Sequence, residues 1–98
     1  MYNFVQDLNK AFENRIRLGV MSVLMVNETV SYNKLKELLK ATDGNLASHL
    51  KSLEKLDYIM VEKQFVNRKP LTTYKATPLG KEAFKRHLNA LEKMLKGE

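Results

Sequence analysis

Apolar side chains recur at intervals of three and four residues through the first half of the chain, a pattern typical of helices that turn one face toward a core. The spacing predicts a first helix over residues 2–13 and a second that begins after Asn14. A third begins after Ser31, and a fourth runs over residues 43–56 with Thr42 as its N-cap. These N-cap assignments follow because Ser, Thr and Asn accept hydrogen bonds from the free N–H groups of a first helical turn.

The apolar period then changes to two, which indicates strands. Residues 58–76 alternate on both sides of a polar turn at residues 67–70, so a hairpin is expected there. Thr77 followed by Pro78 predicts a helix start, because Pro at the first helical position sacrifices no hydrogen bond. The last helix is expected over residues 78–95, and residues 29–30 form a short extended piece.

The resulting order is helix, helix, short strand, helix, helix, strand, strand, helix. This mainly α (α+β) order predicts a winged helix-turn-helix fold in a single domain over residues 1–98. A helix after a tight turn fits the major groove of duplex DNA, and a following hairpin reaches neighbouring phosphates or the minor groove. We therefore expect helix 43–56 in the major groove and hairpin 58–76 as the wing.

The fourth helix has one leucine face, made of Leu46, Leu50 and Leu53, and an opposite face without acids, since Glu54 falls toward the inward side. The opposite face is small, hydrogen-bonding and basic, which suits contacts with base edges and phosphates. The candidate DNA-binding residues of this helix are Gly44, Asn45, Ser48, His49, Lys51, Ser52 and Lys55. Two roles fit His49, at the edge of the leucine face: contact with DNA, or packing between the helix and the wing.

The hairpin tip is basic, and its candidate DNA-binding residues are Asn67, Arg68 and Lys69. Two further lysines, Lys63 and Lys75, lie on the flanking strands and are not among these candidates. Arg68 is the strongest of these candidates, because a guanidinium binds phosphate and enters narrow minor grooves. Charged residues also occupy exposed turns to protect sheet edges, and an ordinary surface helix is amphipathic as well. The succession of a basic helix and a basic hairpin favours DNA binding over these two alternatives.

The last helix repeats Phe and Leu at spacings of four, three and four, close to a coiled-coil seam. A core of this size does not cover that stripe together with an apolar first helix, so we expect the terminal helices, about 2–13 and 78–95, to form a homodimer interface. Its expected residues are Phe4, Val5, Leu8, Phe12, Phe84, Leu88, Leu91 and Leu95. The alternative is that both helices pack only within the monomer. A twofold dimer sets two fourth helices about 34 Å apart, which implies a palindromic site.

Composition narrows the functional class. The net charge of +6 over 98 residues permits polyanionic partners. Cysteine is absent, and no apolar run approaches the ~20 residues of a membrane span, so we expect a cytoplasmic, nucleoid-associated protein without membrane contact. The sequence contains no P-loop, no dinucleotide-binding glycine motif and no nucleophile–base pattern, so we expect no enzymatic activity and no cofactor.

Three segments resemble the small prokaryotic winged helix regulators related to the MarR and ArsR groups: NRIRL at residues 14–18, DGNLxxHL at 43–50 and YxxTxxG at 74–80. The resemblance covers most of the chain. It implies a dimeric regulator that binds duplex DNA with the helix that starts near Thr42 and the hairpin around Arg68. It also implies that Ser31, Asn33 and Lys34 lie near the DNA backbone, so these three residues and Thr42 join the candidate DNA-binding residues.

The chain departs from the pattern of this family at Ala76, where a larger apolar residue is common. Metal-sensing relatives of the ArsR group use clustered Cys, His and carboxylates. This sequence has no Cys and only two histidines, His49 and His87, so we expect no metal site.

The sequence therefore predicts a sequence-specific, double-stranded DNA-binding transcriptional regulator, a repressor that acts as a homodimer on a palindromic operator. The alternative is a winged helix that serves as a protein–protein interaction module without DNA binding, since fold does not fix function. Structured RNA is disfavoured, because its deep, narrow groove excludes a helix. An unidentified small-molecule effector fits between the helices of a dimer, where the aromatic residues Tyr2, Phe4, Phe12 and Phe84 are expected to gather.

Overall fold

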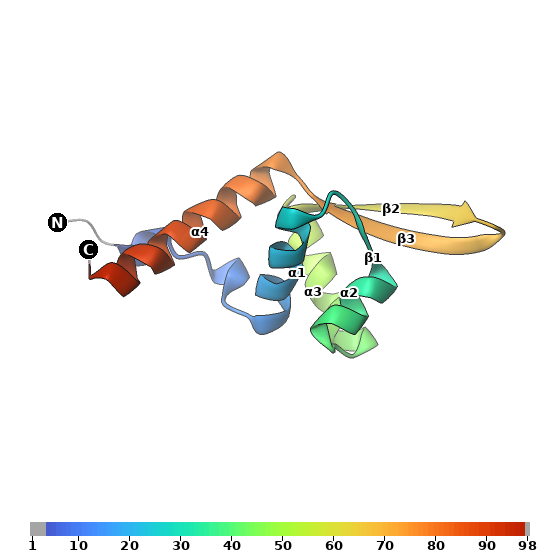
Figure 1. Ribbon diagram of the computed structural model, residues 1–98, viewed down its shortest axis with the longest axis horizontal. Helices are drawn as coiled ribbons and strands as arrows, with labels where there is room; N and C mark the ends of the chain where they lie inside the picture. The colour runs from blue at the N-terminus through green and yellow to red at the C-terminus, as the bar shows by residue number, and fades with distance from the viewer. Residues whose placement is uncertain (1–3, 98) are drawn as a thin grey trace.

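The computed structural model of the protein describes residues 4–97 and has principal extents of 57 × 25 × 21 Å. Within these residues, four α-helices and a three-stranded antiparallel sheet follow two short 3-10 segments (Figure 1). The helices are α1 (Arg15–Val26), α2 (Tyr32–Leu39), α3 (Asp43–Lys55) and α4 (Pro78–Lys96). The strands are β1 (Val30–Ser31), β2 (Ile59–Val66) and β3 (Lys69–Ala76), and the 3-10 segments are η1 (Phe4–Asp7) and η2 (Lys10–Phe12). The mainly helical winged helix fold is the predicted one.

The four α-helices begin where the sequence predicts, because polar side chains cap their first turns. Asn14, Ser31, Thr42 and Thr77 each accept a hydrogen bond from a backbone N–H group two or three residues ahead. Each cap also has an extended backbone, as an N-cap requires. The caps fix the start of α3 and therefore its position after the tight turn.

The N-terminal segment is not the helix that was expected over residues 2–13. Residues 1–3 lie outside the described residues, and the rest forms η1 and η2, separated by Leu8 and Asn9. The backbone N–H of Asn9 donates to Nδ1 of His87 at 2.9 Å, and its side-chain amide donates to the hydroxyl of Tyr58 at 3.0 Å. The helix stops because Asn9 bonds to distant residues, and the first element in the predicted order is wrong for this reason.

The hairpin turn is tighter than the sequence suggested. Only Asn67 and Arg68 lie between the strands, and both have positive φ, at 54° and 65°. Two central residues at positive φ match the right-handed twist of the flanking strands. Pro70, which was expected in the turn, is part of β3, where β1 no longer pairs with that strand. One edge of β3 pairs with β2, and the other edge is unpaired at Pro70. A Pro, which has no N–H to donate, is tolerated on a strand with an unpaired edge.

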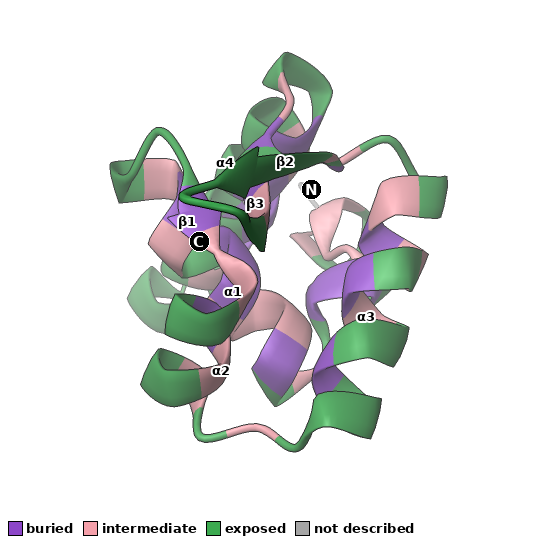
Figure 2. Cartoon of the chain, turned by 90° about the vertical axis from the view of Figure 1, so that its right-hand side faces the viewer, coloured by how far each residue is buried: buried purple, intermediate pink, exposed green. Residues whose placement is uncertain are grey.

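The core lies between η2, α1, α2, α3, the base of the sheet and the first turns of α4, and Figure 2 shows buried positions on the inward faces of the helices. Leu46, Leu50 and Leu53 on α3 are all buried, as predicted. Gly19 lets α1 approach α2, since a Cβ at that position would collide with the side chain of Leu39. Gly19 therefore marks a close packing contact between the two helices.

Two of the eight predicted interface residues belong to the core of the monomer. Phe12 and Phe84 are each 2% exposed, and their rings meet edge to face with centroids 5.1 Å apart. Because each is covered by the same chain, neither is available to a second subunit, and the expectation that they lie on an interface is wrong. The alternative of packing within the monomer holds for these two residues.

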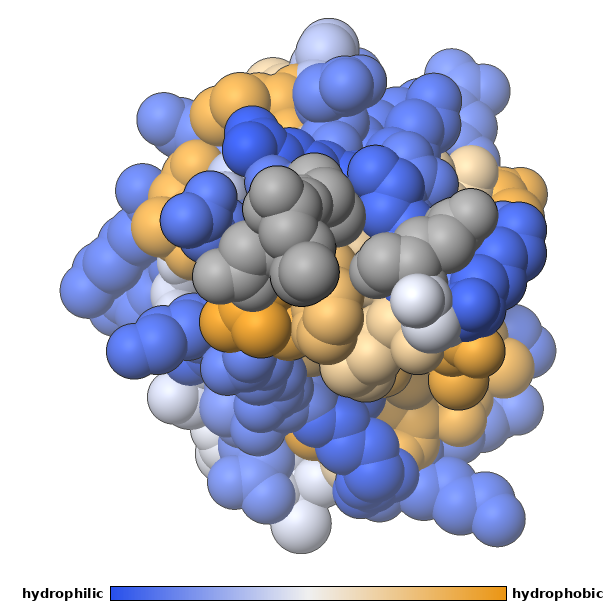
Figure 3. All heavy atoms as spheres, turned by 90° about the vertical axis from the view of Figure 1, so that its left-hand side faces the viewer, coloured by the Kyte–Doolittle hydropathy of each residue, from blue (hydrophilic) through white to orange (hydrophobic). Residues whose placement is uncertain are grey.

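The far end of α4 extends beyond the core together with η1 (Figure 1). The carboxylate of Asp7 joins the two elements by accepting hydrogen bonds from Nε and Nη2 of Arg86, at 2.8 and 2.6 Å. Viewed end-on, this part of the molecule shows hydrophobic surface among hydrophilic side chains (Figure 3). Large apolar side chains exposed in this region are Val5, Leu88, Met94 and Leu95. Across residues 4–97, no helix is both long enough and apolar enough to cross a membrane.

Candidate nucleic-acid interface

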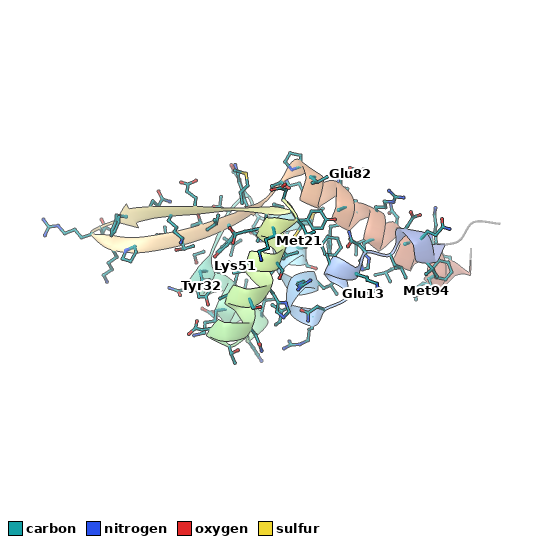
Figure 4. The ribbon with its side chains drawn as sticks, turned by 180° about the vertical axis from the view of Figure 1, so that it is seen from behind. Glu13, Met21, Tyr32, Lys51, Glu82 and Met94 are labelled. Atoms are coloured by element: carbon teal, nitrogen blue, oxygen red, sulfur yellow. The ribbon has the colours of Figure 1, made fainter. Side chains whose placement is uncertain are left out.

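The helix α3 and the hairpin form the two sides of a groove of about 530 Å³. The residues that line it are Ala47, Lys51, Glu54 and Lys55 from α3, and Lys63 and Tyr74 from the hairpin. Figure 4 shows Lys51 on α3 beside the base of the hairpin. Lys51, Lys55 and Lys63 therefore face a groove that is open to solvent.

The lining of the groove corrects the expected position of Glu54 and adds Lys63 to the candidate DNA-binding residues. Glu54 was expected on the inward side of α3, but it is half-buried and lines the groove, so that surface carries one acid. Lys63 was not among the predicted DNA-binding residues. The signal for it was available, because the two-residue period of β2 places Lys63 on the same face as the inward-facing Ile59 and Val61.

The predicted face of α3 is solvent-accessible over most of its length. Its exposed members are Gly44, Asn45, Ser48, Lys51 and Lys55. Ser52 is half-buried, and its hydroxyl donates to the backbone carbonyl of Ser48 at 3.2 Å. Backbone bonding of this kind occupies the Ser52 proton, so Ser52 is a weaker candidate than its neighbours.

His49 contacts α1 and not the wing. It is half-buried, and Nε of Arg17 donates a hydrogen bond to its Nδ1 at 3.0 Å. Burial lowers the pKa of His49, and the positive charge of Arg17 lowers it further. His49 therefore packs within the protein, as one of its two expected roles requires. Its partner is Arg17 of α1, where a contact between the helix and the wing was expected. Arg17 is 32 residues away along the chain, so no local pattern points to it as the partner of His49.

The start of α3 is joined to α2 by side chains that the sequence analysis did not single out. The hydroxyl of Tyr32 donates to Oδ1 of Asp43 at 3.0 Å, and Nζ of Lys36 lies 3.0 Å from Oδ2. The hydrogen bond from Lys36, and then that from Tyr32, lowers the pKa of Asp43. These bonds pair the acid at the beginning of α3 within the protein, which lessens its repulsion of an approaching phosphate.

The residues expected near the DNA backbone lie at the two helix starts. Ser31 and Thr42 use their side-chain oxygens as caps, accepting from the N–H groups of Lys34 and Asn45 at 3.1 and 3.3 Å. Asn33 and Lys34 are exposed on the first turn of α2, and Nζ of Lys34 lies 3.7 Å from a carboxylate oxygen of Glu37. An exposed pair at that distance contributes little to stability, so it leaves Lys34 available to a phosphate.

The basic tip of the hairpin projects far from the core (Figure 1). Asn67, Arg68 and Lys69 are all exposed there. The hairpin therefore extends the groove surface outward and ends in two cationic side chains.

A buried histidine lies on α4, where that helix packs against the N-terminal segment. His87 is 3% exposed, its Nδ1 accepts the bond from Asn9, and its ring packs against that of Phe12 with centroids 5.4 Å apart. Burial lowers the pKa of His87, and the nearby carboxylate of Glu13 opposes that shift. The neutral imidazole is therefore the form that fits the fold.

Acidification is expected to destabilise the protein through His87. Its pKa is lower in the folded chain than the ordinary value of 6.5, so the unfolded chain binds the proton first. The free energy of unfolding is then complete above pH 6.5 and falls as the pH drops below it. Urea unfolding at pH 7.5, 6.0 and 5.0 measures this. In His87→Gln, which keeps an acceptor but does not titrate, the dependence should be shallower, and an unchanged dependence would exclude His87 as its source.

The family model of the winged helix DNA-binding domain matches residues 16–95. An uncharacterised protein of Methanocaldococcus jannaschii is 35% identical over 79 residues, which are 81% of this chain and 86% of that protein.

Solved structures of similar shape include two regulators. A transcriptional regulator homologue from Pyrococcus horikoshii has a TM-score of 0.87 and 29% identity, and the match covers 96% of this chain and 95% of that one. A putative MarR-like transcription regulator from Bacillus cereus has a TM-score of 0.72 and 26% identity, with 96% and 70% of the two chains covered.

Proposed function

The chain belongs to the winged helix DNA-binding domain family of transcriptional regulators, and we propose that it acts as a homodimeric repressor on a palindromic operator. In this proposal α3 enters the major groove and the hairpin β2–β3 is the wing. The observation that carries it is the groove between α3 and the hairpin, where Lys51, Lys55 and Lys63 converge. A sugar-phosphate strand fits such a groove, because cationic side chains on both walls neutralise its charge.

Base recognition falls to the exposed face of α3. Asn45 and Ser48 are short and exposed near the beginning of the helix, which is the part that contacts base edges in helix-turn-helix proteins. Asn pairs with adenine through two hydrogen bonds, and Ser contacts either base edges or phosphate. Lys51 and Lys55 follow on the side of the wing, where a phosphate strand would run.

A protein-interaction module is the second candidate, and the charge of this surface argues against it. Around α3 and the wing, the acid Asp43 is paired with Lys36, and Glu54 is half-buried among three lysines. The exposed Glu62 lies on the face of β2 turned away from the groove. A protein partner would have to be strongly acidic to match this surface. Duplex DNA has that charge along its whole length.

The dimer rests on the exposed apolar side chains of α4. Leu88 and Leu95 are 42% and 86% exposed, and they follow the four-three-four spacing that continues through the half-buried Leu91. A second copy of α4, related by a twofold axis, offers the same stripe in return. Of the predicted interface, Phe4, Val5, Leu8, Leu88, Leu91 and Leu95 remain in this proposal. Dimerisation would set the two copies of α3 about one DNA turn apart.

Repression is the simplest activity for such a dimer, since an occupied operator excludes other proteins from the same DNA. No catalytic step is needed for it, and it would act on DNA in a prokaryotic cytoplasm. A small-molecule effector fits the same proposal if it binds where the N-terminal segment meets α4 near the dimer interface. A pocket there is lined by four apolar residues, Leu8, Phe12, Leu18 and Leu91, and by four polar or charged ones, Glu13, Asn14, Arg15 and His87.

The paired substitution Lys51→Ala and Arg68→Ala tests the DNA-binding face. Removing one cation from the groove and one from the wing tip should weaken binding to a selected duplex about tenfold or more. Both side chains are exposed, so the melting temperature should hardly change. Fluorescence anisotropy measures the affinity and circular dichroism the fold.

A matched control removes the same charge elsewhere. Lys81→Ala with Lys85→Ala takes two exposed cations from α4 and should leave the affinity within about threefold. Equal losses in both double variants would mean that net charge alone governs binding, and wild-type affinity in the first would remove the proposed face.

A further inference from the structure

An aromatic side chain near the wing tip has no role in the monomer fold. Phe65 lies close to the end of β2 and is 79% exposed. It is paired in register with Pro70 of β3, which is also exposed. An exposed Phe side chain forgoes the free energy that burial of its apolar area would contribute. The ring is therefore apolar area that a bound partner can cover.

Strand geometry places Phe65 on the side of the wing that faces α3. Side chains alternate between the faces of a strand, so Phe65 lies on the same face as Ile59, Val61 and Lys63. Of these, Ile59 is in the core and Lys63 lines the groove with α3. Phe65 stands two residues beyond Lys63, about 7 Å farther from the core. It therefore extends the groove surface outward, and the hairpin overhangs α2 and α3 in Figure 2.

Cations lie on both sides of Phe65 along the hairpin. Lys63 precedes it on the same face, and Arg68 and Lys69 follow at the tip, all of them exposed. An apolar ring between cations matches a surface that is apolar between two rows of phosphates. The minor groove of DNA is such a surface, because its walls are deoxyriboses and its floor is base edges.

We propose that Phe65, backed by Pro70, is the minor-groove contact of the wing, with Lys63 and Arg68 on the flanking phosphates. This inference rests on the proposed DNA-binding function and adds to it a residue that acts without charge. Inserted apolar side chains partly unstack base steps, and pyrimidine–purine steps resist this least. Phe65 would therefore favour such a step where the wing meets the operator.

The uncharged nature of the contact gives a distinctive test. Contacts with phosphate release counterions and set the slope of log affinity against log salt, whereas an apolar contact releases none. We select a duplex from a random pool with the wild-type chain and then measure its affinity by anisotropy at several salt concentrations. Phe65→Ala should weaken binding roughly tenfold at every salt concentration without a change in slope. Arg68→Ala should reduce the slope by about one.

The neighbouring residue supplies the control. Val66 is 45% exposed and lies on the opposite face of β2, so Val66→Ala should bind within about twofold of wild type. Phe65→Leu, which keeps apolar bulk, should retain most of the affinity. Both variants should melt like the wild type, because the hairpin tip is outside the core.

The outcomes separate this inference from the function on which it rests. Wild-type binding together with an unchanged Phe65→Ala affinity overturns the role of Phe65 and leaves DNA binding intact. An equal loss in Val66→Ala, or a reduced salt slope in Phe65→Ala, also overturns it. A change in sedimentation of Phe65→Ala without a change in DNA affinity would assign the ring to a protein contact instead. If the wild type selects no DNA, both proposals fail.

Discussion

Gly80→Ala should lower the free energy of unfolding by about 3 kcal/mol, although alanine is the better helix former. Gly80 lies in the first turn of α4, against the backbone of Tyr58 at the junction of α3 and β2. A Cβ at Gly80 would overlap the carbonyl oxygen of Tyr58 and lie 2.7 and 2.8 Å from its carbonyl carbon and Cα. That oxygen also accepts a hydrogen bond from the N–H of Thr77 at 3.0 Å, so the backbone cannot yield without losing the bond.

Another helical glycine provides the control. A Cβ at Gly44 on α3 would meet no atom within 4 Å, so Gly44→Ala should leave stability unchanged or raise it by up to about 1 kcal/mol. Urea unfolding compares the two variants directly. A Gly80→Ala midpoint equal to that of wild type would mean that α4 does not approach Tyr58 so closely. The contact matters for function because it fixes the helix of the proposed dimer interface to the base of the wing.

Leu88→Asp should convert the proposed dimer into monomers. The substitution places a carboxylate in the middle of the apolar stripe of α4, where a second subunit would have to bury it. The dissociation constant of the dimer should rise at least about 100-fold. DNA affinity should fall with it, because two linked half-sites bind far more tightly than one. Sedimentation velocity measures the first effect and anisotropy the second.

The adjacent Asn89 separates the effect of charge from the effect of position. Asn89→Asp adds the same negative charge at an exposed position that is outside the stripe, so this variant should remain dimeric. Leu88→Asp that sediments as a dimer would show that α4 is not the interface. A wild-type chain that sediments as a monomer would remove the dimer altogether.

The parts of the fold that depend on neighbouring residues could be predicted from the sequence. The four helix caps and the change of period at β2 are local features, and the structure confirms them. The N-terminal segment could not be predicted in this way. Its apolar spacing is helical, but Asn9 bonds to Tyr58 and His87, which are 49 and 78 residues away. Contacts at such distances leave no trace in local periodicity, and the burial of Phe12 against Phe84 was missed for the same reason.

The candidate DNA-binding site also has a part that local sequence patterns predict and a part that they do not. The exposed face of α3 follows from the helical wheel, and it agrees with the structure at Asn45, Ser48 and Lys51. The groove depends on how the hairpin folds over α3, which a wheel does not describe. Glu54 was therefore assigned to the wrong side and Lys63 was left out, although the strand period alone places Lys63 on the inner face.

We propose that α3 and the wing bind duplex DNA, and the other predictions about function depend on this. The most direct test is the affinity of the wild-type chain for a mixed-sequence duplex, measured by fluorescence anisotropy from low to high salt. The groove lysines and the basic tip predict a steep loss of affinity with salt, with a slope that corresponds to roughly 4–8 neutralised phosphates per dimer. No binding at the lowest salt would contradict the claim, and the basic surface would then have to face an acidic protein.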